Sequence, residues 1–102
     1  MLQITFRHMD SSESLRAGAE ERLARLQQHH EGAIRCRVVI DCAGTSESRA
    51  PDQFTVHVDL SIGAEHAQAH ATSSHEDAGS ALREAFSHAE RQLEVHHKRR
   101  TA

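Results

Sequence analysis

Apolar residues recur along the chain with two different periods, and these periods predict four strands and two helices. Apolar and polar residues alternate over residues 34–42 and 54–62, as in strands with one buried face. The β-branched and aromatic segment at residues 2–6, LQITF, predicts a first strand. Apolar spacings of three and four, typical of one face of a helix, predict helices over residues 12–29 and 78–97.

Residues 64–71, AEHAQAHA, fit either a helix or a strand. Ala, Glu and Gln favour a helix, whereas Ala67, Ala69 and Ala71 alternate with polar residues as in a strand. We interpret the segment as the fourth strand. The next residues, TSSHED at 72–77, then offer N-cap residues and acids for the start of the second helix.

Capping residues are expected at both ends of the first helix. Asp10 and Glu13 have the spacing of a capping box, and Gly32 is placed to stop the helix. The segment AGTSESRAPDQ, which contains the only proline, is predicted to be a loop.

The predicted order of elements, β-α-β-β-β-α, indicates an α+β two-layer sandwich. In this fold a four-stranded sheet packs two helices on one face, and its other face is exposed to water. We expect a single domain over residues 1–97, followed by a basic C-terminal tail at residues 98–102. The polar residues expected on the exposed sheet face are Arg35, Arg37, His57, Asp59, His66 and His70.

The chain carries 15 acidic and 12 basic residues, a formal net charge of −3, which disfavours nucleic-acid binding through bulk charge. The cations are unevenly distributed, however. Residues 51–97 hold two arginines against eight acids, and the cations Lys98, Arg99 and Arg100 follow directly. Ten histidines add a reserve of positive charge, because histidine titrates at about pH 6.5.

The N-terminal segment has no signal-peptide pattern, and no apolar run approaches the roughly 20 residues that span a bilayer. We therefore expect a cytoplasmic protein without a membrane partner. The two cysteines, Cys36 and Cys42, fit a reducing compartment as small core residues. Six residues apart on one strand, they would lie about 20 Å from each other and could not form a disulfide.

Three segments, in the same order, resemble a known family. They are SESLRAGAEERLARLQQH in the first helix, the apolar run RVVIDC in the second strand, and AFSHAERQLEVHHK in the second helix. Together they resemble the ribosome hibernation-promoting factor and ribosome-associated inhibitor family, also called sigma-54 modulation proteins. Arg16 falls on an arginine of the family pattern, and Arg22 and Arg25 fall on its lysines.

The resemblance implies a short, stand-alone factor that binds the small ribosomal subunit. Such factors occupy the channel for tRNA and mRNA, contact 16S rRNA phosphates through both helices, and inhibit translation in stressed or stationary cells. We expect no catalysis, no cofactor and no small-molecule substrate; the oligomeric state stays open, with a monomer favoured. The candidate rRNA-binding residues are Arg16, Arg22, Arg25, His29, His88, Arg91, His97, Lys98, Arg99 and Arg100.

Some positions depart from the family pattern and motivate an alternative. Lysines of the family fall on His88, Val95 and His97 in this chain, and a tyrosine falls on Gly79. The alternative is a protein-interaction or regulatory module of the same fold that has lost ribosome binding.

A histidine-rich metal-binding domain is a third hypothesis. On a helix, His66 and His70 would have a common zinc spacing, but on the strand that we prefer they lie about 13 Å apart. We therefore expect no metal site. No nucleophile elbow, phosphate loop or paired-carboxylate motif occurs in the sequence, so we expect no enzyme.

Overall fold

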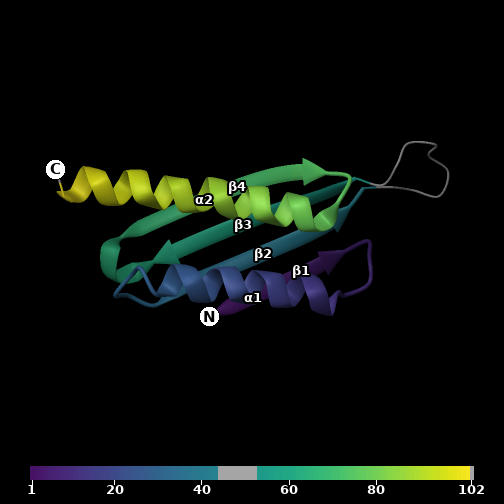
Figure 1. The fold of residues 1–102 in the computed structure, drawn as a ribbon, viewed down its shortest axis with the longest axis horizontal. Coiled ribbons are helices and arrows are strands. Elements are labelled where there is room, and N and C mark those ends of the chain that lie inside the picture. Colours follow the sequence, from purple (N-terminus) through teal and green to yellow (C-terminus); the bar gives the residue numbers. More distant parts are fainter. Residues whose placement is uncertain (44–52, 102) are drawn as a thin grey trace.

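The computed structural model of the chain describes residues 1–43 and 53–101, with side chains described up to residue 95. Most of the predicted loop AGTSESRAPDQ lies outside these residues. The elements follow the predicted order (Figure 1). They are β1 (Leu2–Arg7), α1 (Glu13–Gln27), β2 (Ile34–Cys42), β3 (Phe54–Ile62), the 3-10 helix η1 (Gly63–Glu65), β4 (Ala67–His75) and α2 (Ala78–Thr101).

The four strands form one sheet in the order β1-β2-β3-β4. β1 and β2 are parallel because α1 connects them, and the other two pairs are antiparallel. Both helices lie side by side on the same face of the sheet and run in the same direction (Figure 1). The predicted two-layer α+β fold is confirmed.

The core lies between the sheet and the helices, and every second side chain of the central strands points into it. β2 and β3 bury Ile34, Cys36, Val38, Ile40, Val56, Val58, Leu60 and Ile62. Phe86 on α2 is the largest side chain in this core and has no exposed surface. Burying a side chain of this size stabilises the fold by about 1.5–3 kcal/mol, so α2 is held firmly against β3 and β4.

The strand interpretation of the ambiguous alanine-rich segment is confirmed for residues 67–71. β4 continues to His75, however, so TSSH extends the strand and does not open α2. Pairing with β3 over the full length of both strands explains the extension, because it outweighs the local preference of serine for helix caps. Ser73 is buried, and its hydroxyl donates a hydrogen bond to Glu84 on α2 (2.7 Å).

Each helix starts at a polar side chain that accepts hydrogen bonds. Ser12 caps α1 by accepting from the Leu15 amide (3.3 Å), so the predicted capping box of Asp10 and Glu13 is wrong. At α2, a carboxylate oxygen of Asp77 accepts from the amide (2.9 Å) and hydroxyl (2.8 Å) of Ser80. These hydrogen bonds hold the pKa of Asp77 below its ordinary value.

The sheet face opposite the helices is polar, as predicted. The exposed residues there include Arg7, Arg35, Arg37, His57, Asp59 and His70. The placement of His66 on this face is wrong. His66 ends η1 with φ of 50° and lies in the turn before β4, because the reversal of the chain requires a left-handed residue.

Candidate functional site

The end of α1 is fixed by Gln27, and this positions the histidines that follow. The side-chain oxygen of Gln27 accepts from the Ile34 amide (2.9 Å), and its NH₂ group donates to the Gly32 carbonyl (2.8 Å). The helix therefore ends at Gln27, before the glycine that was expected to stop it. Gly32 has a packing role instead, since a Cβ there would lie 2.7 Å from the Ala64 Cβ.

His30 ties this loop to the turn between β3 and β4. Its Nδ1 lies 2.9 Å from a carboxylate oxygen of Glu65 in η1, and both side chains are mostly buried. Because a carboxylate only accepts, the imidazole donates this hydrogen bond. The sequence contains no signal for this contact, which joins residues 35 positions apart.

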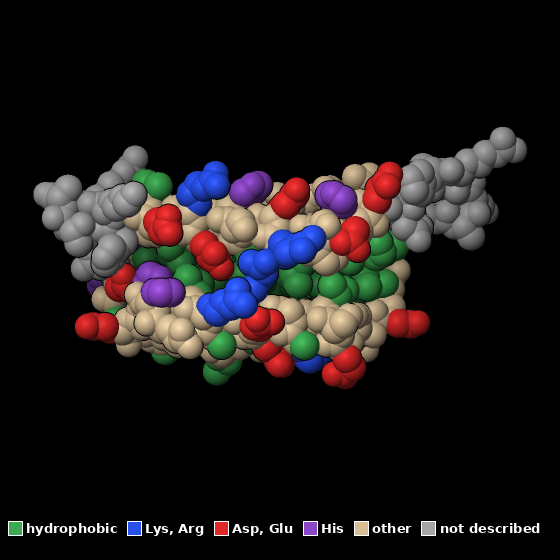
Figure 2. All heavy atoms as spheres, viewed as in Figure 1, with side chains coloured by type: hydrophobic (Ala, Val, Ile, Leu, Met, Phe, Trp, Pro, Cys, Tyr) green, Lys and Arg blue, Asp and Glu red, His purple; other side chains and the backbone are tan. Residues whose placement is uncertain are grey.

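Three of the candidate rRNA-binding residues come together in a groove between the helices. This inter-helix groove has a volume of about 320 Å³ and is lined by Arg22, Arg25, Leu26, His29, His30, Glu90 and Glu94. Figure 2 shows basic side chains (blue) across the groove, with acidic side chains (red) beside them along α2. The α1 side of the groove is therefore basic, whereas the α2 side is acidic.

Glu90, on the α2 side of the groove, has a shifted pKa. Burial raises its pKa above the ordinary value, and Glu94 raises it further, while Arg22, Arg25 and His29 act in the opposite direction. The burial effect prevails. The helical pattern alone did not reveal this acidic wall, because the periodicity of α2 does not say which of its edges faces α1.

Arg25, the exposed arginine of the groove, has a weakly bound partner. The guanidinium of Arg25 binds Glu21 one turn earlier on α1 at 2.7 Å, and both side chains are largely exposed. Such a pair contributes about 0.3–0.5 kcal/mol. Arg25 can therefore exchange this carboxylate for a phosphate at little cost.

The remaining candidates lie elsewhere. Arg16 is half-buried on α1 and does not line the groove. His88 and Arg91 border a separate hollow of about 380 Å³ with Gln92 and Val95, here called the outer α2 patch. His97, Lys98, Arg99 and Arg100 lie outside the described side chains, although α2 itself continues to Thr101.

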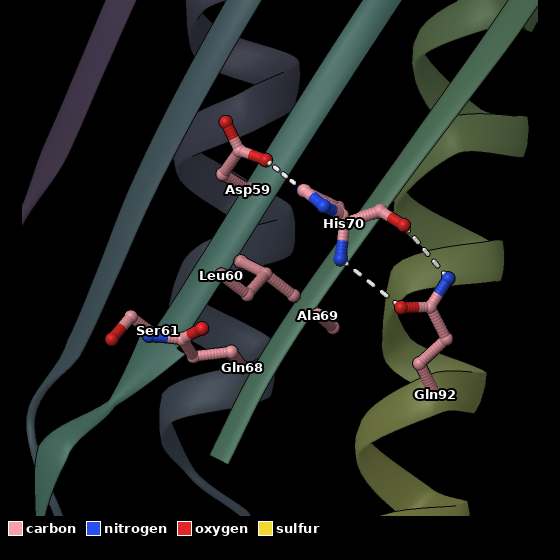
Figure 3. Close-up of a pocket in the computed structure, with 7 residues that line it drawn as sticks. All are labelled: Asp59, Leu60, Ser61, Gln68, Ala69, His70 and Gln92. Carbon is pink, nitrogen blue, oxygen red and sulfur yellow. Dashed lines mark hydrogen bonds and ion pairs between the residues drawn. The ribbon is translucent and has the colours of Figure 1, made fainter. Parts of the chain in front are cut away.

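Gln92, the glutamine of the RQL segment, has a role that the sequence did not indicate. Its side chain reaches the outer edge of β4 and makes two hydrogen bonds with the backbone of His70 (Figure 3). The amide oxygen accepts from the His70 N–H (3.0 Å), and the NH₂ group donates to the His70 carbonyl (2.8 Å). Gln92 thus occupies one position of an edge that another strand could otherwise pair with.

The environment of Cys36 is not that of a catalytic thiol. Burial raises the pKa of Cys36 to about 12, so this thiol stays protonated. Cys42 is half-buried, and both are free thiols. Within residues 1–43 and 53–101, no three His, Cys, Asp or Glu side chains are grouped to hold a metal ion. Over the same ranges, no helix combines the length and apolar character needed to span a bilayer.

Residues 2–101 match the family described as sigma 54 modulation protein / S30EA ribosomal protein. The chain belongs to this family. The match covers almost the whole sequence, and it agrees with the resemblance carried by the two helices and the second strand. The S30EA family is one of ribosome-associated factors.

Two solved structures have a fold similar to that of this chain. The N-terminal domain of Protein Y from Thermus thermophilus is 17% identical, with a TM-score of 0.72 and 93% of each chain covered. A ribosomal subunit interface protein from Coxiella burnetii is 16% identical, with a TM-score of 0.74, covering 95% of this chain and 97% of that one. At these identities the similarity shows a shared fold. A search of curated proteins finds no significant match.

Proposed function

We propose that this protein binds the small ribosomal subunit through 16S rRNA in the tRNA and mRNA channel and inhibits translation under stress. It acts in the cytoplasm and carries out no catalysis. Membership of the S30EA family supports ribosome association. The observation that supports a phosphate-binding role most directly is the gathering of Arg22, Arg25 and His29 on the α1 side of the inter-helix groove.

The chemistry of the groove suits contact with an RNA backbone. Phosphate contacts position a protein without reading sequence, and two rigid helices present their cations in a fixed geometry. Arg22 and Arg25 lie about one helical turn apart, and His29 follows after another turn. The basic side of the groove therefore offers a short row of donors that can follow consecutive phosphates.

Competition with the natural occupants of the channel tests this proposal. Binding of the protein to purified 30S subunits should weaken as tRNA and mRNA are added, and the protein should inhibit translation in a reconstituted system. Replacing Arg22 and Arg25 together by glutamine removes two cations, so the slope of log K against log salt should become shallower by about 1.4–1.8. Binding that is indifferent to tRNA and mRNA would contradict the channel location.

A second function, recognition of a protein partner, has support from the outer α2 patch. Val95 is 45% exposed, one of two large exposed hydrophobic side chains among the described residues, and His88, Arg91 and Gln92 surround it. A small apolar centre with a polar rim is typical of a protein contact. Enrichment of one non-ribosomal protein by the wild type, lost in a Val95→Glu variant, would favour this function.

A further inference from the structure

Three arginines are exposed on the open sheet face: Arg7, Arg35 and Arg37. Among the residues that the structure describes, no carboxylate forms an ion pair with these three side chains at 4.0 Å or less. In the inter-helix groove, by contrast, Arg25 is already paired with Glu21. The free cations of this domain are therefore on the sheet as well as on the helices.

The two aspartates of this face are engaged by histidines. Asp41 accepts a hydrogen bond from Nδ1 of His8 (2.8 Å), and Asp59 accepts one from Nδ1 of His70 (2.6 Å). The three arginines of the face outnumber these two aspartates.

A shallow hollow of about 420 Å³ lies in the middle of this face. Arg7, Arg37 and His57 border it, Val39 forms part of its lining, and Asp59 and His70 close one side. The imidazole of His57 is held by the Thr72 hydroxyl at 2.9 Å, so its position is fixed. Two guanidinium groups and an imidazole around an open hollow offer donors to a phosphate group.

The spacing of the arginines favours an extended polyanion over a single phosphate. Arg35 and Arg37 are two residues apart on one strand, roughly 7 Å. Arg7 pairs with Asp41, six residues along β2 from Arg35, which places it roughly 20 Å away from Arg35. One phosphate cannot reach all three side chains, whereas consecutive phosphates of an RNA strand can.

The face is not suited to reading bases by stacking. Phe6 on β1 and Phe54 on β3 alternate toward the face that the helices cover, and Phe86 of α2 is fully buried in the core. Contact through the backbone is therefore the mode that remains for nucleic acid on this surface.

We propose that the open sheet face, through Arg7, Arg35 and Arg37, is a second phosphate-binding surface, so that RNA holds the domain from both faces. This inference rests on the proposed function, because it names a second contact with the same partner. The domain would sit between two RNA segments, with the helix groove on one and the sheet on the other.

Two matched double variants test the second surface. Arg35→Gln with Arg37→Gln changes the sheet, and Arg22→Gln with Arg25→Gln makes the same charge change on α1. Both should retain the fold by circular dichroism. The sheet arginines are exposed and make no ion pair with a described residue, and the exposed pair of Arg25 with Glu21 contributes little to stability. For the sheet variant we expect the slope of log K against log salt for 30S binding to become shallower by about 1.4–1.8. If the two proteins have equal affinity at 1 M salt, the variant then binds about 25- to 60-fold more weakly than the wild type at 0.1 M salt.

The outcomes separate the two proposals. If the sheet variant binds 30S subunits like the wild type while the α1 variant is weakened, the second surface is wrong and the proposed function stands. If the wild type binds at no salt concentration, the proposed function fails, and the rRNA contact on the sheet fails with it.

An NMR titration distinguishes an RNA strand from free phosphate. A single-stranded RNA oligonucleotide should shift amide signals of β2 at phosphate concentrations where inorganic phosphate leaves them unchanged. Equal shifts with inorganic phosphate would overturn the polyanion assignment.

Discussion

Replacing Glu90 by glutamine tests whether the acidic wall of the inter-helix groove weakens phosphate binding. The carboxylate lies in the same groove as Arg22, Arg25 and His29, and it competes with any phosphate for their charge. Its removal makes about one more cation available to the RNA. Counterion release then predicts that the slope of log K against log salt is steeper by about 0.7–0.9 in the variant. If the two proteins have equal affinity at 1 M salt, the variant then binds about 5- to 8-fold more tightly than the wild type at 0.1 M salt.

The assay is binding of labelled protein to 30S subunits at four or five salt concentrations. Glu76→Gln is the matched control: Glu76 is exposed, and it precedes α2 by two residues. Glu90 is 12 residues into the helix, so the two sites are separated by roughly 18 Å or more, beyond the Debye length of about 10 Å at 0.1 M salt. Equal affinity and slope for the two variants would refute the reasoning.

The same variant has a second readout in stability. Burial raises the pKa of Glu90 above its ordinary value, so the folded protein binds this proton more tightly than the unfolded chain does. The protonated form of Glu90 therefore stabilises the fold at low pH, and this contribution is lost as pH rises from the ordinary pKa of a glutamate through the raised pKa of Glu90. Glutamine does not titrate, so we expect the variant to have the higher Tm at pH 7 and the difference to narrow below about pH 4.

Three further predictions follow from single contacts. Gln92→Ala should lower the free energy of unfolding by about 1 kcal/mol. It should also speed hydrogen exchange of the His70 amide on β4, measured by mass spectrometry, and unchanged exchange would contradict the contact. Asp77→Ala should lower the Tm at neutral pH, with the loss vanishing as pH falls through the lowered pKa of Asp77, whose stabilising contribution exists only above it. A thiol reagent should label Cys42 in the folded protein and reach Cys36 only on unfolding, because burial keeps that thiol protonated.

The periodic parts of the fold were predictable from the sequence because burial of one face leaves a clear pattern. Alternation matches the buried positions from Ile34 to Ile40 in β2 and from Val56 to Ile62 in β3, whereas Cys42 and Phe54, expected on the same face, are only half-buried at the strand ends. The ends of elements were less predictable. Ser73 and Ser74 resemble helix caps in isolation, and only pairing with β3 makes them part of β4. A left-handed turn at His66 likewise depends on where the chain must reverse.

The part of the candidate site on α1 was predictable from helical spacing, but its position relative to α2 was not. Arg22, Arg25 and His29 share an edge of α1 by helical spacing, and the structure places them in one groove. The rotation of α2 about its axis is set by packing of its core residues. That rotation turns Glu90 toward the arginines and His88 away from them, which no pattern within α2 could reveal.

Co-sedimentation with purified 30S subunits tests the central claim most directly. The wild-type protein should pellet with the subunits at low salt and about pH 6–7, and it should be released progressively as salt is raised, in proportion to its phosphate contacts. Absence of the protein from the pellet at every salt concentration and pH would contradict ribosome binding.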